Sequence, residues 1–578
     1  MKGKIIGILA VLVIALAAFF IGRYVEQNVP GNTWAKLSDY YAVKEGQALV
    51  FRNQIAEEKM VTLLDGEPFL PYEEAQVYLK RLYQDIPTEQ IIYTTPTKIY
   101  MMKADETAYT LNEQPAESEK PFIRTLNGEY YVSFEFISLF YDWDVTLYED
   151  PDRLMIYDET ATYQYVTVEK ETQLRVRDNI KSEILMDLAA GQKLYLAEEP
   201  ADEEEEKKKK DKNAFLCVMT EDGISGYVQQ KQLADGGEAA SEERTFSHPT
   251  DQELYTSVDL GEPVIMVWHQ VFNETANSYL EDQLTGVSGV NVISPTWFSV
   301  IETNGKLSTL ADHDYVEKAH ALGLQVWPSI TDFETSVNFS TLFASETYRR
   351  NLINNIFWFI YKYDLDGINI DFERVTPNNA ADYTQFLREL SLACRNENLV
   401  LSIDNYVPTA YTAYYDREEE GILADYVMVM AYDEHYSGSE EAGSVSSLDW
   451  VRNGVRALSE LVEGRKIVAG LPFYTRVWYE TKNADGSVSL SSEAMSETAA
   501  ANRVAAAGVE PTWDGATGQY YAEWTSENTT AKVWLEEERS LATKLEVLDP
   551  TQIGGLAFWK LGLERDGVWD VIADWKGN

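Results

Sequence analysis

Runs of strand-forming residues alternate with helical patterns throughout the second half of this 578-residue chain. Eight such runs follow residue 256, and they are apolar enough for strands that are covered on the outside by helices. They are Pro263–Trp268, Val290–Ser294, Leu324–Pro328, Leu365–Glu373, Val400–Asp404, Tyr426–Tyr432, Lys466–Pro472 and Gly555–Trp559. Eight parallel strands with intervening helices close into a TIM barrel, whose carboxyl-terminal mouth carries the chemistry. The sequence therefore predicts an α/β fold with a (β/α)8 barrel over residues 256–578.

The fourth run alternates with period two, so apolar and polar side chains face opposite sides of the predicted strand. The two sets are Ile368, Ile370 and Phe372, and Asn369, Asp371 and Glu373. An apolar outer face and a carboxylate-bearing inner face suit a barrel strand. Two carboxylates two residues apart, with little water, push their pKa values apart, so that Glu373 stays protonated and acts as a general acid. The spacing alone is equally compatible with a solvated strand end or with a divalent-cation site.

The stretch from Asp366 to Glu373 resembles the signature of glycoside hydrolase family 18, Asp-Gly-x-Asp-x-Asp-x-Glu. It departs from that signature where Asn369 replaces the family's Asp, and this variant is similar to the family's bacterial cell-wall and spore-cortex branch. The resemblance implies a glycosidase without a metal or other cofactor. Glu373 and Asp371 would be catalytic, and Asp366 and Asn369 would help to bind the substrate.

Further motifs at the ends of predicted strands carry the same resemblance. Met428 to Asp433 is similar to the family's sixth-strand signature, which makes Tyr432 catalytic and gives Met430 and Asp433 contacts with the sugar. Trp559 matches the eighth-strand Trp that lies under the bound sugar, and Tyr474 follows the seventh strand. Three other tryptophans fall near strand ends, where they either line sugar subsites or simply pack: Trp268, Trp297 and Trp327.

The family mechanism implied by the resemblance uses the substrate's own N-acetyl group as the nucleophile. Glu373 would protonate the leaving oxygen, and Asp371 would orient the acetamide and stabilise the cyclic intermediate. Asn369 is expected to donate a hydrogen bond to ionised Asp371, which predicts a narrower pKa shift for Asp371 and a pH optimum set mainly by Glu373. The segment from Trp478 to Trp524 is long for a connection and predicts a small hairpin insertion beside the cleft.

Smaller modules are predicted ahead of the barrel. Residues 36–160 contain a weak repeat, in which Asp65–Glu73 aligns with Asn127–Glu135, and they resemble the α+β stalk domain of copper amine oxidases, without a His cluster for copper. Residues 163–234 carry short strand patterns and resemble a bacterial SH3-like small β-barrel, a module that often binds peptidoglycan. Residues 235–255 form a predicted linker. The acidic and basic run Asp202–Lys212 is expected to be a solvated loop.

Residues 1–24 contain an uncharged run from Ile5 to Ile21 after Lys2 and Lys4. This pattern predicts a transmembrane anchor with the remaining chain outside the cell membrane, or a signal peptide that leaves the protein secreted. The two cysteines fall in different predicted domains, which argues against a disulfide framework.

The net charge and the predicted modules limit which molecules this protein is expected to bind. A net charge of -47 argues against nucleic acid, which requires a basic face. Peptidoglycan and chitin both contain N-acetylglucosamine, and the predicted envelope modules favour peptidoglycan. The alternatives are a chitinase, a sugar-binding barrel without activity, and a metal-dependent esterase or deacetylase. Five His residues without a paired ligand motif give little support to the last of these.

Overall fold

The computed structural model describes residues 14–25, 28–197, 214–245, 254–549 and 551–577. The chain divides into two compact units. The first contains residues 1–80, 102–109 and 115–252, and the second contains residues 81–101, 110–114 and 253–578. The predicted barrel lies in the second unit, together with two short segments that come from the predicted stalk domain.

The two copies of the sequence repeat in the first unit fold alike. Asp65 and Gly66 have positive φ at the first turn, and Asn127 and Gly128 have positive φ at the second, as a tight Asx-Gly hairpin requires. In each copy the hairpin leads into a short helix, and the two copies pair antiparallel through β4 and β11. The elements are β3 (Val61–Leu64), β4 (Glu67–Pro71), α3 (Tyr72–Tyr78), β10 (Ile123–Leu126), β11 (Glu129–Ser133) and α4 (Phe134–Ser138). The predicted order of turn, strand and helix is confirmed.

Two sheets build most of the first unit. The repeat strands join β1 (Gln47–Arg52), β12 (Asp144–Tyr148) and β13 (Arg153–Tyr157) in one sheet. The other has seven strands in the order β16-β15-β19-β18-β17-β14-β20. These are β14 (Ala161–Thr167), β15 (Thr172–Arg175), β16 (Ile184–Leu188), β17 (Lys193–Leu196), β18 (Phe215–Met219), β19 (Ser225–Gln229) and β20 (Ala240–Arg244). The short strands expected of residues 163–234 are present, and the identity of both modules stays a prediction.

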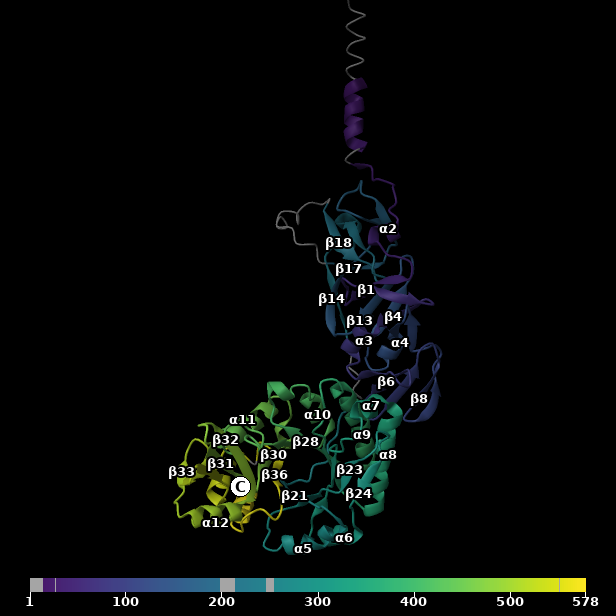
Figure 1. The fold of residues 1–578 in the computed structure, drawn as a ribbon. Coiled ribbons are helices and arrows are strands. Elements are labelled where there is room, and N and C mark those ends of the chain that lie inside the picture. Colours follow the sequence, from purple (N-terminus) through teal and green to yellow (C-terminus); the bar gives the residue numbers. More distant parts are fainter. Residues whose placement is uncertain (1–13, 26–27, 198–213, 246–253, 550, 578) are drawn as a thin grey trace, which may run out of the picture. The chain divides into compact units, whose positions relative to one another are not determined.

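Eight parallel strands, one of them made of two short pieces, form the barrel of the second unit. In chain order they are β21 (Val264–His269), β22 (Val292–Pro295), the pair β25 (Gln325–Val326) and β26 (Ser329–Thr331), β27 (Gly367–Asp371), β28 (Val400–Tyr406), β29 (Tyr426–Met430), β30 (Ile467–Pro472) and β36 (Gly555–Trp559). Figure 1 labels four of them: β21, β28, β30 and β36. The third strand of the barrel is interrupted at Trp327 and Pro328. The backbone amide of Asp366 donates to the Val326 carbonyl beside this interruption and so closes the barrel. β23 (Phe298–Val300) and β24 (Leu307–Thr309) form a hairpin that pairs with β26. The prediction of a TIM-barrel-like domain is confirmed.

Helices cover the outside of the barrel, and apolar residues fill both sides of its wall. They are α5 (Leu280–Gln283), α6 (His313–Ala321), α7 (Phe339–Ala344), α8 (Glu346–Tyr363), α9 (Ala380–Glu397), α10 (Arg417–Leu423), α11 (Leu448–Ser459), α13 (Glu538–Leu545) and α14 (Val568–Lys576). The outward strand residues Ile368 and Ile370 pack in a core with these helices. A separate cluster containing Met266, Trp327 and Met428 fills the barrel interior, so the barrel is a packed core with its opening at one end.

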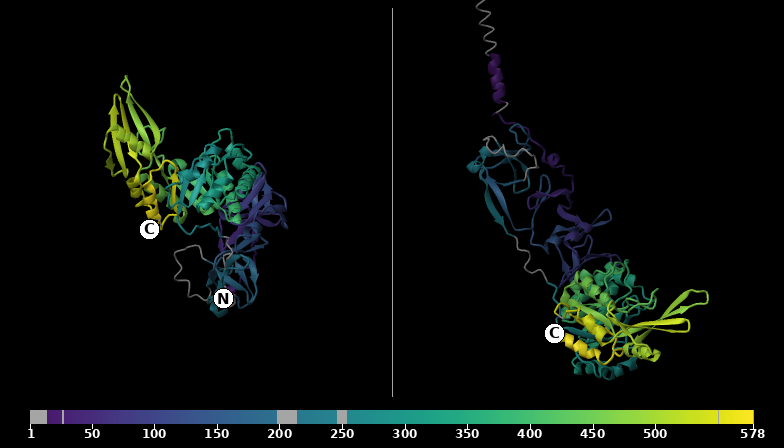
Figure 2. Two further views of the ribbon diagram at one scale, coloured as in Figure 1. Left: turned by 90° about the horizontal axis from the view of Figure 1, so that it is seen from below. Right: turned by 90° about the vertical axis from the view of Figure 1, so that its left-hand side faces the viewer.

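The segment between the last two barrel strands is a domain-like insertion. Five antiparallel strands and one helix, α12 (Glu497–Ala507), replace the small hairpin that was predicted. The strands are β31 (Tyr474–Lys482), β32 (Val488–Ser496), β33 (Thr512–Asp514), β34 (Gln519–Ser526) and β35 (Thr529–Leu535). Both views in Figure 2 show these yellow-green strands extending away from the barrel. The insertion is larger than predicted because α12 and the long β31–β32 hairpin come before the strands around Gly518–Trp524.

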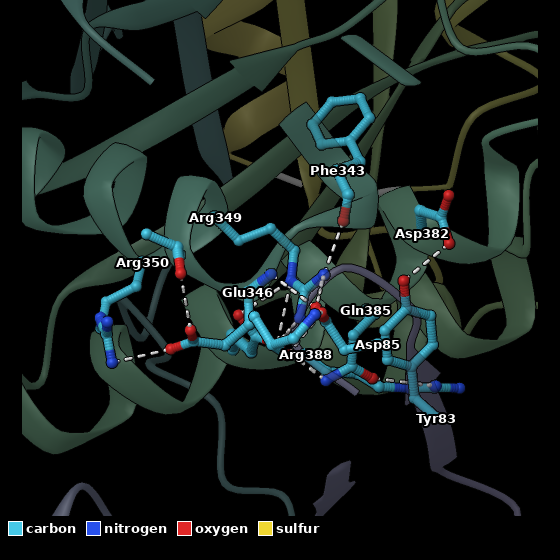
Figure 3. A network of polar contacts seen from close by, with 12 residues as sticks. Tyr83, Asp85, Phe343, Glu346, Arg349, Arg350, Asp382, Gln385 and Arg388 are labelled. Carbon is cyan, nitrogen blue, oxygen red and sulfur yellow. Dashed lines mark hydrogen bonds and ion pairs between the residues drawn. The ribbon is translucent and has the colours of Figure 1, made fainter. Parts of the chain in front are cut away.

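Residues 81–101 pack against the barrel through a buried polar network (Figure 3). The hairpin β5 (Leu82–Asp85) and β6 (Gln90–Thr94) brings Asp85 against α8, where Arg349 Nη1 lies 3.1 Å from Asp85 Oδ2. The same guanidinium pairs with Glu389 of α9 at 2.9 Å. Both side chains of the Asp85–Arg349 pair are fully buried. A hairpin expected in the stalk domain is therefore part of the catalytic unit.

Some predictions fall on residues that the structure does not describe. The charged run Asp202–Lys212 and residues 1–13 of the predicted membrane anchor lie outside the described ranges. Within the described ranges, none of the helices combines the length and the hydropathy needed to cross a bilayer. Cys217 and Cys394 lie in different units and are not joined by a disulfide.

Candidate active site

A cavity of about 420 Å³ opens at the carboxyl-terminal ends of the barrel strands. Its lining combines aromatic rings with a few carboxylates and hydroxyl groups, a mixture typical of a ligand-binding site. The lining residues are Trp268, Gln270, Thr296, Phe298, Ser299, Thr331, Phe333, Asp371, Glu373, Asp404, Tyr406, Met430, Tyr432, Asp433, Tyr474 and Trp559. Of the predicted site residues, Glu373, Asp371, Tyr432, Met430, Asp433, Tyr474 and Trp559 meet here.

The alternation predicted for β27 positions both acids. Ile368, Ile370 and Phe372 pack outward into the core beneath the helices. Asn369 and Asp371 consequently point into the barrel, and Glu373 follows on the same face, just past the end of the strand.

Glu373 is held as a half-buried acid. The Tyr406 hydroxyl donates to Glu373 Oε2 at 2.5 Å. Burial raises the pKa of Glu373 above its ordinary value, the Tyr406 hydrogen bond lowers it, and the charge of Asp433 raises it. The backbone amides of Glu373 and Arg374 donate to the two oxygens of Asp332, at 3.0 and 2.8 Å. Asp332 therefore fixes the turn that presents Glu373 to the cavity.

Asp371 sits among like charges. Burial raises its pKa well above the ordinary value, and repulsion from Asp404, Glu373 and Asp332 raises it further. Its Oδ1 atom is shielded from solvent and has no hydrogen-bond partner among the described residues. The narrower pKa shift predicted for Asp371 is therefore wrong.

Asn369 makes different contacts from those predicted. Its Nδ2 donates to Asp404 Oδ1 at 2.8 Å and to the Ser402 hydroxyl at 3.1 Å, while its Oδ1 accepts from Trp268 Nε1 at 3.0 Å. The expected hydrogen bond from Asn369 to Asp371 is absent from these contacts, because the amide turns sideways toward the neighbouring strand. Asn369 is fully buried below the cavity lining, so it supports the site without facing a sugar.

Asp366 lies at the opposite end of the barrel, and its prediction as a substrate-binding residue is corrected. It precedes β27, whereas Glu373 follows it. Its Oδ2 accepts from the Val326 amide at 2.8 Å and contacts His320 Nε2 at 2.9 Å. This carboxylate links the start of β27 to β25 and to α6.

The other aromatic residues divide between site and core. The Tyr474 hydroxyl donates to Asp433 Oδ1 at 2.5 Å, which orients that carboxylate at the rim. Trp268 lies 6.0 Å from Trp559, centroid to centroid, and forms the floor with it. Trp297 and Trp327 are buried in packing contacts and do not line the cavity.

Three residues around the two catalytic acids were not predicted from the sequence: Asp332, Asp404 and Tyr406. Asp404 and Tyr406 continue the inward-facing positions of β28 beyond Ser402. The same period-two pattern that identified Asp371 was therefore available for them. Asp332 follows β26, a strand too short to give a clear pattern.

Replacing Asn369 by Asp should change the pH profile more than the choice of substrate. The variant adds a carboxyl group next to Asp404, and like charges raise each other's pKa. The acid limb of the kcat profile should therefore move to higher pH, because ionising Asp371 becomes harder. Rates measured from pH 4 to 9 on two glycans check this, and a profile that matches the wild type would refute it.

The closed barrel and the paired acids in a cavity of sugar-binding size define a carbohydrate-active hydrolase. The chain belongs to glycosyl hydrolases family 18, whose profile matches residues 267–564. The protein is therefore a glycosidase, an enzyme that hydrolyses glycosidic bonds.

Relatives of known sequence and structure agree with this assignment. The chain is 25% identical over 296 residues to the "Uncharacterized glycosylase YvbX" of Bacillus subtilis, covering 49% of this chain and 84% of that protein. It is 29% identical over 241 residues to the "Cortical fragment-lytic enzyme" of the same organism, covering 40% of this chain and 55% of that protein, about half its length. The crystal structure of the C-terminal domain of a putative chitinase from Desulfitobacterium hafniense DCB-2 superposes with a TM-score of 0.50 and 23% identity. It covers 54% of this chain and 99% of that one, and it supports the barrel fold.

Proposed function

We propose that this glycosidase cleaves β-linked N-acetylglucosamine in peptidoglycan with net retention, using the substrate's acetamide as the nucleophile. The observation that carries the proposal is that Glu373, Asp371 and Tyr432 line one cavity, in which burial raises the pKa of Glu373 and so favours the protonated form of a general acid.

Each residue then has a defined role. Glu373 protonates the leaving oxygen, which its raised pKa favours. Asp371 orients the acetamide and stabilises the positive charge of the cyclic intermediate, and ionised Glu373 afterwards deprotonates water. Tyr432 donates a hydrogen bond to the acetamide, and the Trp559 ring supports the sugar. Met430 and Asp433 contact the same sugar from the rim.

A cation beside the cavity favours an acidic glycan. Lys560 Nζ donates to the cavity residue Gln270 at 2.6 Å and lies 5.2 Å from the ring centroid of Phe272. Burial lowers the pKa of Lys560, and none of the described carboxylates forms an ion pair with it. Peptidoglycan carries carboxylates on its muramic acid and peptide groups, whereas chitin is uncharged. The similarity to a cortical fragment-lytic enzyme also supports peptidoglycan.

Replacing Lys560 by Gln should lower the ratio of kcat/KM for peptidoglycan to kcat/KM for chitin oligomers by about tenfold, the size of one charge-assisted contact. Lys318→Gln, on the outer helix α6, is the matched control because its lysine is exposed and pairs with Glu281. An unchanged ratio in the Lys560 variant would show that Lys560 does not contribute to the preference for peptidoglycan over chitin.

Digestion of purified vegetative and spore peptidoglycan beside chitin oligomers, followed by mass spectrometry, tests the substrate directly. New reducing-end N-acetylglucosamine from peptidoglycan is the expected product. Efficient cleavage of chitin oligomers alone would identify a chitinase, and glycan binding without turnover would identify a non-catalytic barrel.

The remaining modules fit a protein of the cell envelope. We infer that the residues after the apolar N-terminal run lie outside the cell membrane, anchored by that run or secreted after its cleavage. The repeat sheet would act as a stalk, and residues 163–234, which supply most of the seven-stranded sheet, would act as an SH3-like wall-binding module. Fractionation of cells that express the full chain tests the location.

A further inference from the structure

Strand β28 brings a second Asp beside Asp371. β27 and β28 run parallel, with Asn369 opposite Ser402 and Ile370 opposite Ile403. The Asn369 and Ser402 side chains hydrogen-bond to each other inside the barrel. Asp371 and Asp404 occupy the positions two residues further on, so both point inward. Because neighbouring strands are about 4.8 Å apart, the two carboxyl groups lie side by side.

The surroundings of this pair are acidic. The side chain of Asp404 is buried, and its Oδ1 accepts from Asn369. The titratable groups that act on the pair are Asp332, Glu373, Tyr383, Tyr406 and Tyr432. Asp433 acts on the pair through Glu373. Lys and Arg side chains are missing from these described neighbours, so no positive charge offsets the repulsion.

We propose that Asp371 and Asp404 form one acidic pair that shares a single proton, which rests on Asp371 before the reaction and passes to Asp404 during it. The proposal rests on the substrate-assisted mechanism. When positive charge develops on the substrate, the O–H bond on Asp371 breaks and an O–H bond forms on Asp404. The pair keeps one proton and one negative charge throughout, while the negative charge moves next to the cyclic intermediate.

The pair also explains the role of Asn369. In the family signature this position carries an Asp on the same strand as the catalytic acids. In this chain the carboxyl group belongs instead to Asp404 on the adjacent strand β28. The Asn369 amide donates to it at 2.8 Å and holds it in place. Burial raises the pKa of Asp404, the Asn369 hydrogen bond lowers it, and repulsion from Glu373 raises it again, so that the net direction is upward.

The variant Asp404→Asn removes the titrating group and keeps the contact, because the new amide oxygen still accepts from Asn369. We expect kcat to fall about tenfold or more, with KM changed less than twofold. The acid limb of the kcat profile should move to lower pH, because Asp371 then titrates without its charged neighbour. Wild-type kcat and a wild-type profile in this variant would overturn the proposal.

Moving the carboxyl group back provides a rescue. The double variant Asn369→Asp/Asp404→Asn reverses the hydrogen bond and restores a paired carboxyl on β27. It should recover most of the kcat lost in Asp404→Asn, and a double variant no more active than the single one would contradict a shared proton.

Infrared spectroscopy of the full chain gives a readout that needs no turnover. A protonated buried carboxyl absorbs separately from carboxylates, and this band should persist at pH 7 in the wild type and weaken in both Asp371→Asn and Asp404→Asn. A band unaffected by either variant would overturn the shared proton. A retained band in a wild type that leaves acetamido glycans uncut would overturn only the proposed function.

Discussion

Replacing Glu373 by Gln should lower kcat by roughly 10²-fold or more, because the amide cannot donate a proton to the leaving oxygen. The change is nearly isosteric, and the Tyr406 hydroxyl can still donate to the amide oxygen. KM should therefore change little. Initial rates on a soluble acetamido oligosaccharide at several concentrations separate the two constants.

The control for this prediction is Glu302→Gln, which removes an exposed carboxylate near the barrel hairpin. Equal thermal unfolding of both variants would show that the Glu373 substitution leaves the fold intact. A Glu373 variant with wild-type kcat would mean that another residue is the acid.

Replacing Arg349 by Ala should lower the free energy of unfolding by about 3–5 kcal/mol, the usual effect of removing one partner from a buried ion network. Arg349 is fully buried, and it contacts Asp85, Glu389 and the Phe343 carbonyl. The variant leaves two buried carboxylates without their cation. Urea unfolding followed by tryptophan fluorescence measures the loss.

A surface ion pair supplies the matched comparison. Lys306 and Glu302 are 2.6 Å apart, with side chains 58% and 46% exposed. Lys306→Ala should cost only about 0–1 kcal/mol, since solvent screens such pairs. Similar losses in both variants would show that the Asp85–Arg349 contact is not an essential part of the catalytic unit.

The barrel could be predicted because its information is local. Each buried strand carries its own apolar run, and β36 begins and ends at the predicted residues Gly555 and Trp559. The period-two pattern likewise placed Asp371 and Glu373 on the inner face. These features depend on neighbours within a few residues, which a sequence displays directly.

Contacts across strands could not be predicted in the same way. Which group the Asn369 amide would meet depends on the register of β27 against β28, and that register places Asp404 within reach. The role of Asp366 was misjudged because a shared motif does not say which of its members contact the substrate, although Asp366 precedes β27 and Glu373 follows it. The docking of Asp85 on α8 joins residues more than 250 positions apart and leaves no local pattern.

The most direct test of the account is the requirement for the acetamide. Rates are measured on one purified peptidoglycan before and after chemical removal of its N-acetyl groups, with the reducing ends identified by mass spectrometry. If the substrate supplies the nucleophile, cleavage should occur only at N-acetylated glucosamine. The cleavage rate should fall in proportion to the fraction of N-acetyl groups removed. Equal cleavage of the de-N-acetylated polymer would contradict the mechanism.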